Sequence, residues 1–373
     1  MICPHCEHRL LRKERPGNRC AYCRRVYALD PKTNALELSD LRVRRVMAAL
    51  SADGRLAVAP GQLWYALSRR SLRKSSLGDA WNSFTGVLGL GLLLAGVLIP
   101  FVPAIVAGGV LSLVSLSVVV ARSAGVGRGV PQVDRAAFRS EVLTPWLRVY
   151  GELPPGMVDD PVREWTPDGA PPALPRTAPP KTAPPKTVAG APAPADRAAG
   201  VLLCPDPSVI AFLAAEGVAG HYGLALVRTL DEAVALAPRG PVIVLHDADA
   251  HGALLVRHVR DAFPGIRVVD AGLPVRKVRG LAHAVPVRDR WHRPDAGGRR
   301  ALAALGEFGT AELKWLGRGW GFPLVGLPPA RLLEVVARCA GRATGRPDPA
   351  RAGAAGVGFL TWPSTGPAEE RRK

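Results

Sequence analysis

The chain has 373 residues, with 49 Lys and Arg against 31 Asp and Glu, which gives a net charge of +18. This length suits two or three domains, and the basic balance favours nucleic acid or anionic lipid headgroups as partners. Six cysteines are too few for a disulfide-dense secreted scaffold. The composition also excludes a fibrous or a fully disordered protein, and its Ala, Arg, Gly and Pro content is typical of a bacterial source.

Four of the six cysteines form two C-x2-C pairs, CPHC and CAYC, thirteen residues apart. This spacing suits one tetrahedral Zn²⁺, because each pair makes a tight turn and the residues between them form a hairpin. Residues 1–37 resemble a zinc ribbon. The resemblance implies a structural zinc bound by Cys3, Cys6, Cys20 and Cys23, with no open position for a substrate. The alternative is four unpaired or disulfide-linked thiols, which we do not favour because so short a segment with few apolar residues needs a staple to fold.

Residues 38–79 are predicted to be a small helical domain. The segment LSDLRVRRVMAAL has helical spacing, Asp53-Gly54 is a turn, and APGQLWYALSRRSLRK starts a second helix at a proline. Helix, turn and helix give the outline of a winged helix. The basic residues that end this segment either meet DNA phosphates or flank the next segment on the cytoplasmic side, and we favour the second interpretation.

Residues 80–121 contain no charged residue and no histidine. A run of this length predicts two transmembrane helices joined at the IPFVP turn. Basic residues lie on both sides of it, so we expect a protein of the cell membrane with two spans, a lipid bilayer as partner and both termini in the cytoplasm. The alternative is a buried hairpin in a soluble core. Residues 122–152 form an amphipathic juxtamembrane segment that lies on the membrane or packs on the N-terminal domain, and residues 153–198 form a Pro-rich linker.

Residues 199–290 alternate short apolar runs with helical segments, which predicts a doubly wound α/β domain with a parallel sheet. In such sheets ligands bind at the carboxyl ends of the strands. Asp247 and Asp249 directly follow the apolar run PVIVLH, and two carboxylates one residue apart can share Mg²⁺. Residues 291–341 are predicted to be a helical extension, and residues 342–373 a disordered tail.

The segment VIVLHDADAHG resembles the second motif of Toprim domains, which occur in primases and in the topoisomerase VI A-subunit family. The resemblance implies Mg²⁺ bound by Asp247 and Asp249, and phosphodiester chemistry. The family places a Glu at the end of the first strand, where this chain has Cys204–Pro205, and the nearest carboxylate is Asp206. This departure predicts a degenerate, non-catalytic domain.

A second similarity to the topoisomerase VI A-subunit family lies in PGQLWYALS at 60–68, which is similar to its winged-helix segment. This implies Tyr65 as a nucleophile that attacks DNA. The alternative, which we favour, is that Tyr65 packs beside Trp64.

The favoured hypothesis is therefore a membrane-anchored cytoplasmic zinc-ribbon protein that is not an enzyme. Its Toprim-like module would bind nucleic acid, a nucleotide or a protein partner. One alternative is a Mg-dependent enzyme acting on DNA phosphodiesters through Asp247 and Asp249, with Asp206 or Tyr65. Another is a receiver-type signalling module phosphorylated at Asp247, although no lysine clearly follows a fifth strand. The last is an α/β domain whose acidic pair caps a helix.

Overall fold

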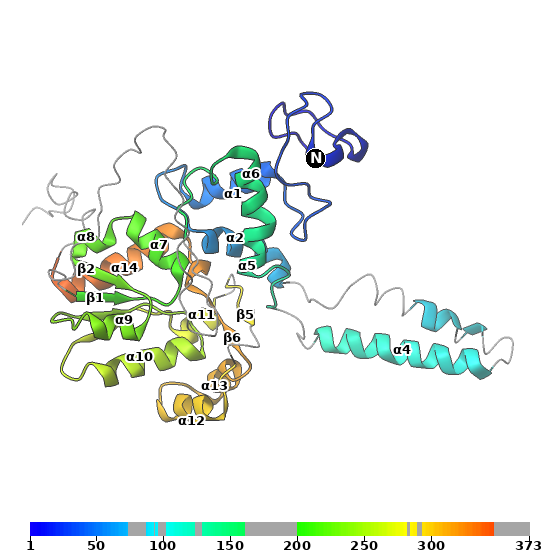
Figure 1. Cartoon of the computed structure of the whole chain (residues 1–373). Helices are drawn as coiled ribbons and strands as arrows, with labels where there is room; N and C mark the ends of the chain where they lie inside the picture. The colour runs from blue at the N-terminus through cyan, green and yellow to red at the C-terminus, as the bar shows by residue number, and fades with distance from the viewer. Residues whose placement is uncertain are drawn as a thin grey trace, which may run out of the picture.

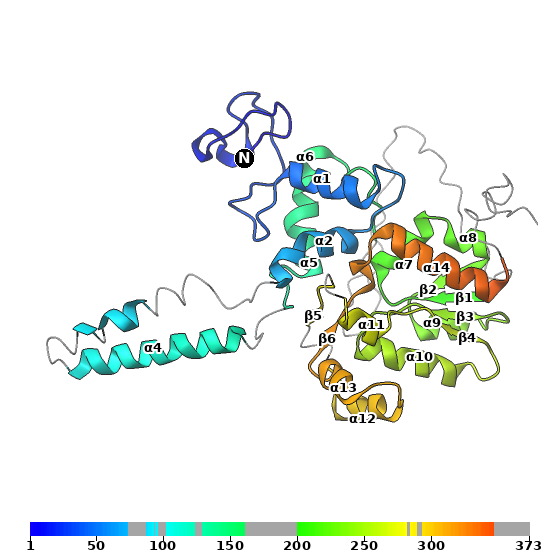
Figure 2. The same ribbon diagram turned by 180° about the vertical axis from the view of Figure 1, so that it is seen from behind.

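The structure, a computed structural model, describes residues 1–73, 87–92, 94–95, 102–123, 129–160, 200–281, 284–288 and 293–346. The predicted Pro-rich linker and tail lie mostly outside these residues. Figure 1 shows an N-terminal cysteine module, a helical module beside it, and an α/β module that carries the sheet, while helix α4 extends away from all three. The view from behind in Figure 2 shows the same separation of α4.

The cysteine module, residues 1–30, is held by short turns rather than by long elements. It contains two 3₁₀ turns, η1 (Arg12–Glu14) and η2 (Pro16–Asn18). Two isolated antiparallel bridges, Ile2 with Arg9 and Arg19 with Val26, close its two cysteine turns. Its apolar core is very small, formed by Cys3, Leu10 and Cys20.

The helical module is assembled from two separate parts of the chain. The first part contributes α1 (Asp40–Leu50) and α2 (Pro60–Arg73), and the second contributes α5 (Arg135–Phe138), the π-helical turn η3 (Arg139–Leu143) and α6 (Thr144–Tyr150). The Trp64 indole Nε1 donates to the Val133 carbonyl at 2.8 Å, and the Tyr150 hydroxyl donates to the Asp40 carboxylate. Residues 129–152 thus pack on the N-terminal helices, which is one of the two arrangements expected for this segment.

The predicted transmembrane hairpin over 80–121 is wrong. Part of that run lies outside the described residues, and the rest forms the helical stretches 87–92 and 94–95 and α4 (Val102–Ser123). Within the described ranges no helix has both the length and the apolar character that crossing a bilayer requires. The predicted two-span membrane location, with both termini in the cytoplasm, is corrected by the same finding. The helical stretches before α4 are short, and α4 itself contains Gly108, Gly109 and several serines, so a lack of charge is not enough to predict a spanning helix.

The α/β module contains the predicted parallel sheet. Its strands are β1 (Gly200–Leu203), β2 (Leu224–Val227), β3 (Val242–Val244) and β4 (Val268–Asp270), in the order β2-β1-β3-β4 with every pair parallel. Short strands buried on both sides need continuous apolar runs, and GVLL and VIV supply them. The helices of this module are α7 (Pro207–Ala215), α8 (Val218–Tyr222), α9 (Leu230–Ala235), α10 (Ala250–Ala262) and α11 (Val275–Arg279).

Alternate residues of the strands enter two separate cores, as strand geometry requires. Leu202 and Ile243 belong to the larger core, which runs on into the helical module, while Val201 and Val242 belong to a smaller core with α9 and α10. The C-terminal extension adds α12 (Ala296–Ala304), α13 (Thr310–Leu316), a two-stranded sheet of β5 (Val287–Arg288) and β6 (Trp320–Gly321), the turn η5 (Leu324–Gly326) and α14 (Pro329–Thr344).

The helical and α/β modules meet near the carboxyl end of β1. The Gly61 amide donates to the Ser208 hydroxyl at 3.1 Å, and the Ala57 amide donates to the Glu216 carboxylate at 2.7 Å. A Cβ atom on Gly61 would lie 2.7 Å from the Ser208 Oγ, so this approach needs glycine. The two modules therefore enclose the edge of the sheet at which ligands of parallel sheets bind.

Candidate metal centre and ligand cavity

The four predicted cysteine ligands come together in the cysteine module. Their sulfur atoms all lie within 4.8 Å of one another. Two of the distances, Cys3 Sγ to Cys23 Sγ and Cys6 Sγ to Cys20 Sγ, are 3.8 Å. A tetrahedral shell with metal–sulfur bonds of about 2.3 Å has edges of about 3.8 Å, so the cluster fits a metal ion and is compatible with structural zinc. Within the part of the chain that the structure describes, this is the one group of three or more ligand-type side chains so placed.

The acidic residues singled out in the sequence lie around a second feature, a cavity of about 970 Å³ between the helical module and the carboxyl edge of the sheet. Asp206, Asp247 and Asp249 line one part of it. Most of the remaining wall is apolar, formed by Trp64, Pro131, Pro205, Leu254, Leu255, Phe322 and Pro323. In a sheet of order 2-1-3-4, the chain passes from β1 to β2 on one side and from β3 to β4 on the other side. The crevice between the carboxyl ends of β1 and β3, where these directions diverge, is the usual ligand site.

Asp206 is paired with an arginine from the helical module. Its Oδ1 caps α7 by accepting the Ser208 amide at 2.9 Å, and its Oδ2 lies 2.7 Å from Nη1 of Arg135. The Arg135 guanidinium carbon also lies 5.3 Å from the centroid of the Trp64 ring. The side chain of Asp206 is 7% exposed and that of Arg135 38%. Arg135 thus brings a permanent positive charge to the acidic end of the cavity.

Asp247 is the most strongly perturbed of the acidic residues. Its Oδ1 accepts the Leu324 amide at 2.7 Å. Burial, followed by the charges of Asp249 and Asp206, raises the pKa of Asp247 to about 7, against the opposing effect of Arg135. A carboxyl group with a pKa near neutrality exchanges between an acceptor and a donor of hydrogen bonds at physiological pH.

Asp249 is the N-cap of α10, where its Oδ1 accepts the Gly252 amide at 2.7 Å. The preceding residue, Ala248, forms an antiparallel bridge with Phe322. Gly321 lies so close that a Cβ atom there would be 2.8 Å from the Asp249 Cβ. The segment from β6 to η5 therefore packs directly against the loop that carries Asp247 and Asp249.

His246 lies between two acceptors, the Asp247 carbonyl at 2.7 Å from Nδ1 and the Asp270 carboxylate at 3.1 Å from Nε2. Because both ring nitrogens face acceptors, the imidazolium form, which donates from both, satisfies the site best. Burial lowers the pKa of His246, but the hydrogen bonds to Asp270 and to the Asp247 carbonyl outweigh this, so the net pKa shift is upward. A Cβ atom on Gly272 would lie 2.1 Å from the His246 Nε2, so glycine gives the ring its space.

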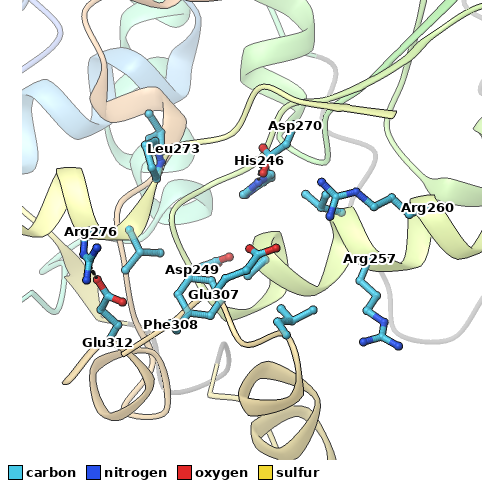
Figure 3. Close-up of a pocket in the computed structure, with 15 residues that line it drawn as sticks. His246, Asp249, Arg257, Arg260, Asp270, Leu273, Arg276, Glu307, Phe308 and Glu312 are labelled. Carbon is cyan, nitrogen blue, oxygen red and sulfur yellow. Dashed lines mark hydrogen bonds and ion pairs between the residues drawn. The ribbon is translucent and has the colours of Figure 1, made fainter. Parts of the chain in front are cut away.

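A smaller cavity of about 220 Å³ lies on the other side of His246. Figure 3 shows His246 beside Asp270 at one end of it and the paired Arg276 and Glu312 at the other. His246 and Asp249 line both cavities.

Tyr65, the residue implied as a nucleophile, is buried and engaged. Its hydroxyl donates to the Val285 carbonyl at 2.8 Å, and its ring packs edge-on against Phe322 with centroids 5.8 Å apart. Burial raises the pKa of the Tyr65 phenol to about 12. It is 3% exposed, and these contacts favour the interpretation of Tyr65 as a packing residue.

Sequence reasoning missed Arg135, His246 and Asp270. Arg135 was assigned to a juxtamembrane segment, and its pairing with Asp206 spans 71 residues, so no local pattern could reveal it. His246 did carry a signal, since it immediately precedes the acidic pair at the end of a buried strand. Comparisons of the chain with protein-family models, with curated proteins and with solved structures found no match.

Proposed function

We propose that the metal held by Cys3, Cys6, Cys20 and Cys23 is zinc with a structural role. Four sulfur atoms within 4.8 Å of one another, two pairs of them 3.8 Å apart, suit tetrahedral zinc, and a complete thiolate shell leaves no position for a substrate. The purified full chain should contain one zinc per molecule, and Cys20→Ser should release it. Cys339→Ser is the matched control and should keep the metal. Iron as the main metal, or a chain that folds normally after chelation, would contradict this assignment.

We propose further that the α/β module is a non-catalytic binding module. The observation that carries this is the Arg135–Asp206 ion pair. The carboxylate that would have to complete a Mg²⁺ site with Asp247 and Asp249 is already neutralised by a guanidinium. Mg²⁺ is bound through oxygen ligands and keeps a strict octahedral geometry, and an arginine beside it would oppose its charge.

The ligand proposed for the 970 Å³ cavity is a nucleobase or nucleoside. Its wall is mostly apolar, with carboxylates at one end, and a cavity of this size takes a small organic ligand. A flat ring system would cover the apolar wall, while its N–H groups would donate to Asp247 or Asp249.

The test uses the full chain and calorimetry with nucleosides, nucleotides and MgCl₂. We expect binding of a nucleoside without Mg²⁺, weakened by Asp249→Asn, which removes a charge while keeping a hydrogen-bonding side chain. Asp261→Asn, an exposed substitution on α10, is the matched control. Binding of Mg²⁺ that Asp247→Asn abolishes, together with cleavage of DNA, would replace this proposal with the enzyme hypothesis.

A second candidate is the receiver-type module. The strand order 2-1-3-4 is the order of the first four strands of the flavodoxin-like fold that receivers share. Asp206 follows β1 and Asp247 follows β3, as that hypothesis requires. Incubation with acetyl phosphate should then add one phosphoryl group to the chain and none to Asp247→Asn. An unchanged mass in both proteins would eliminate this candidate.

A further inference from the structure

The two cysteine turns of the N-terminal module are built alike. In the first, the Glu7 amide donates to the Cys3 carbonyl at 3.1 Å, and in the second the Arg24 amide donates to the Cys20 carbonyl at 2.9 Å. Glu7 and Arg24 both have a positive φ, 58° and 57°. Because the two backbones match, side chains at equivalent positions of the two turns can be compared directly.

The residues two positions after the first cysteine of each turn are His5 and Tyr22, and their surroundings differ. His5 lies beside the helical module, since its ring is 6.1 Å from that of Tyr150 on α6, and its Nε2 is 3.0 Å from the Val26 carbonyl of its own module. Tyr22 is 55% exposed, and its ring stacks on His8 with centroids 4.1 Å apart and an interplanar angle of 31°. His8 is also exposed. One ring from each turn therefore forms an aromatic pair at the surface.

Exposed basic side chains lie near this pair in the sequence, in the same small module. Six of them in residues 1–26 are exposed: Arg9, Arg12, Lys13, Arg19, Arg24 and Arg25. The seventh, Arg15, is buried and paired with Asp30 at 2.5 Å. Glu7 is the exposed acidic residue of residues 1–26, since Glu14 is partly buried and accepts the Leu11 amide. The surface is thus strongly positive, even beside a thiolate–metal cluster of charge about −2.

We propose that this surface, defined by His8, Arg9, Tyr22, Arg24 and Arg25, binds single-stranded nucleic acid. An unpaired base stacks on the exposed face of the His8–Tyr22 pair, and the arginines contact the phosphates on either side. Stacking on exposed aromatic rings is open to the splayed bases of a single strand. A duplex, whose bases are already stacked and paired, would use only the charges. The inference does not depend on the ligand of the α/β module.

The experiment measures fluorescence anisotropy of labelled 12-nucleotide oligo(dT) and oligo(U) with the full chain, beside a duplex of equal length and phosphatidylserine vesicles. We expect Tyr22→Ala to weaken single-strand binding about tenfold, the effect of losing one stacked base. Tyr22→Phe keeps the ring and should bind like the wild type. The double substitution Arg24→Ala/Arg25→Ala should reduce the salt slope by roughly 1.4, since each phosphate contact adds about 0.7 for single strands. Arg331→Ala, on α14, is the control for charge alone.

Retention of one metal per chain in each variant excludes loss of the module's fold as the cause. Because the chain has a net charge of +18, we expect weak binding of nucleic acid through other basic regions. The Tyr22 variants distinguish binding at the proposed surface from this background. Equal affinities of wild type and Tyr22→Ala would overturn the proposal, as would tighter binding of the duplex. Vesicle binding that depends on Tyr22, without single-strand binding, would assign the surface to a membrane instead.

Discussion

Nη1 of Arg135 lies 2.7 Å from Oδ2 of Asp206, which joins the start of α5 to the start of α7. The pair couples the helical module to the α/β module at the acidic end of the cavity. Asp206 is almost fully buried, and its carboxylate oxygens are satisfied by this partner and by the capping amides of α7.

Arg135→Ala should destabilise the chain by about 1–3 kcal/mol, because it leaves a buried carboxylate without its cation while the partial exposure of Arg135 moderates the cost. Urea unfolding measures the change. Arg331→Ala, which removes an exposed arginine paired with Glu334 on α14, should change stability by less than about 0.5 kcal/mol. Equal effects of the two substitutions would show that the Arg135–Asp206 pair has no special role.

Asp247→Asn should stabilise the chain relative to the wild type as pH rises. The pKa of Asp247 is about 7 in the folded chain, above the unfolded value of about 3.9. The folded state therefore binds more protons between these values, and the contribution of Asp247 declines from pH 4 to pH 7. Between pH 5 and pH 8 the free energy of unfolding of Asp247→Asn should therefore rise by up to about 3 kcal/mol relative to that of the wild type. Asp261→Asn is the control and should show no such rise. A difference in unfolding free energy between Asp247→Asn and the wild type that does not change with pH would contradict the raised pKa.

His246 should titrate above the usual histidine pKa of about 6.5, because Asp270 and the Asp247 carbonyl both accept from its ring. Its contribution to stability is full below about pH 6.5 and is lost as pH rises through the raised folded pKa. An NMR titration of the His246 ring measures this directly. Asp270→Asn should lower the pKa of His246, whereas Asp261→Asn should leave it unchanged. A His246 pKa below 6.5 in the wild type would show that burial outweighs its two hydrogen bonds.

Tyr65→Phe distinguishes packing from nucleophilic catalysis. Loss of the hydroxyl leaves the buried Val285 carbonyl without its donor and should cost about 1–2 kcal/mol in urea unfolding. Tyr22→Phe, at an exposed position, should cost almost nothing. If the wild type cleaves DNA and Tyr65→Phe abolishes cleavage at unchanged stability, Tyr65 is a nucleophile after all.

Local patterns predicted the parts of the structure that local interactions determine. The cysteine spacing gave the four-sulfur cluster, and the apolar run before Asp247 gave a buried parallel strand with the acidic loop at its end. The same reasoning failed for residues 80–121, where the absence of charge was mistaken for a spanning hairpin. It also failed for Arg135. This arginine lies in the helical module and contacts Asp206 of the α/β module, so no sequence pattern near Asp206 could reveal it.

The division of the helical module between residues 38–73 and 129–160 has a consequence for biosynthesis. The Trp64 indole on α2 meets its acceptor only when Val133 has been synthesised, and α2 also packs on α5, α7 and η5, which follow it in the chain. The 87 residues that follow Arg73, up to and including Asp160, take roughly 4–17 s to synthesise at about 5–20 residues per second. During that interval the nascent chain on the ribosome exposes an unfinished core together with a long uncharged segment, so this protein should depend on co-translational chaperones more than its folded modules would suggest.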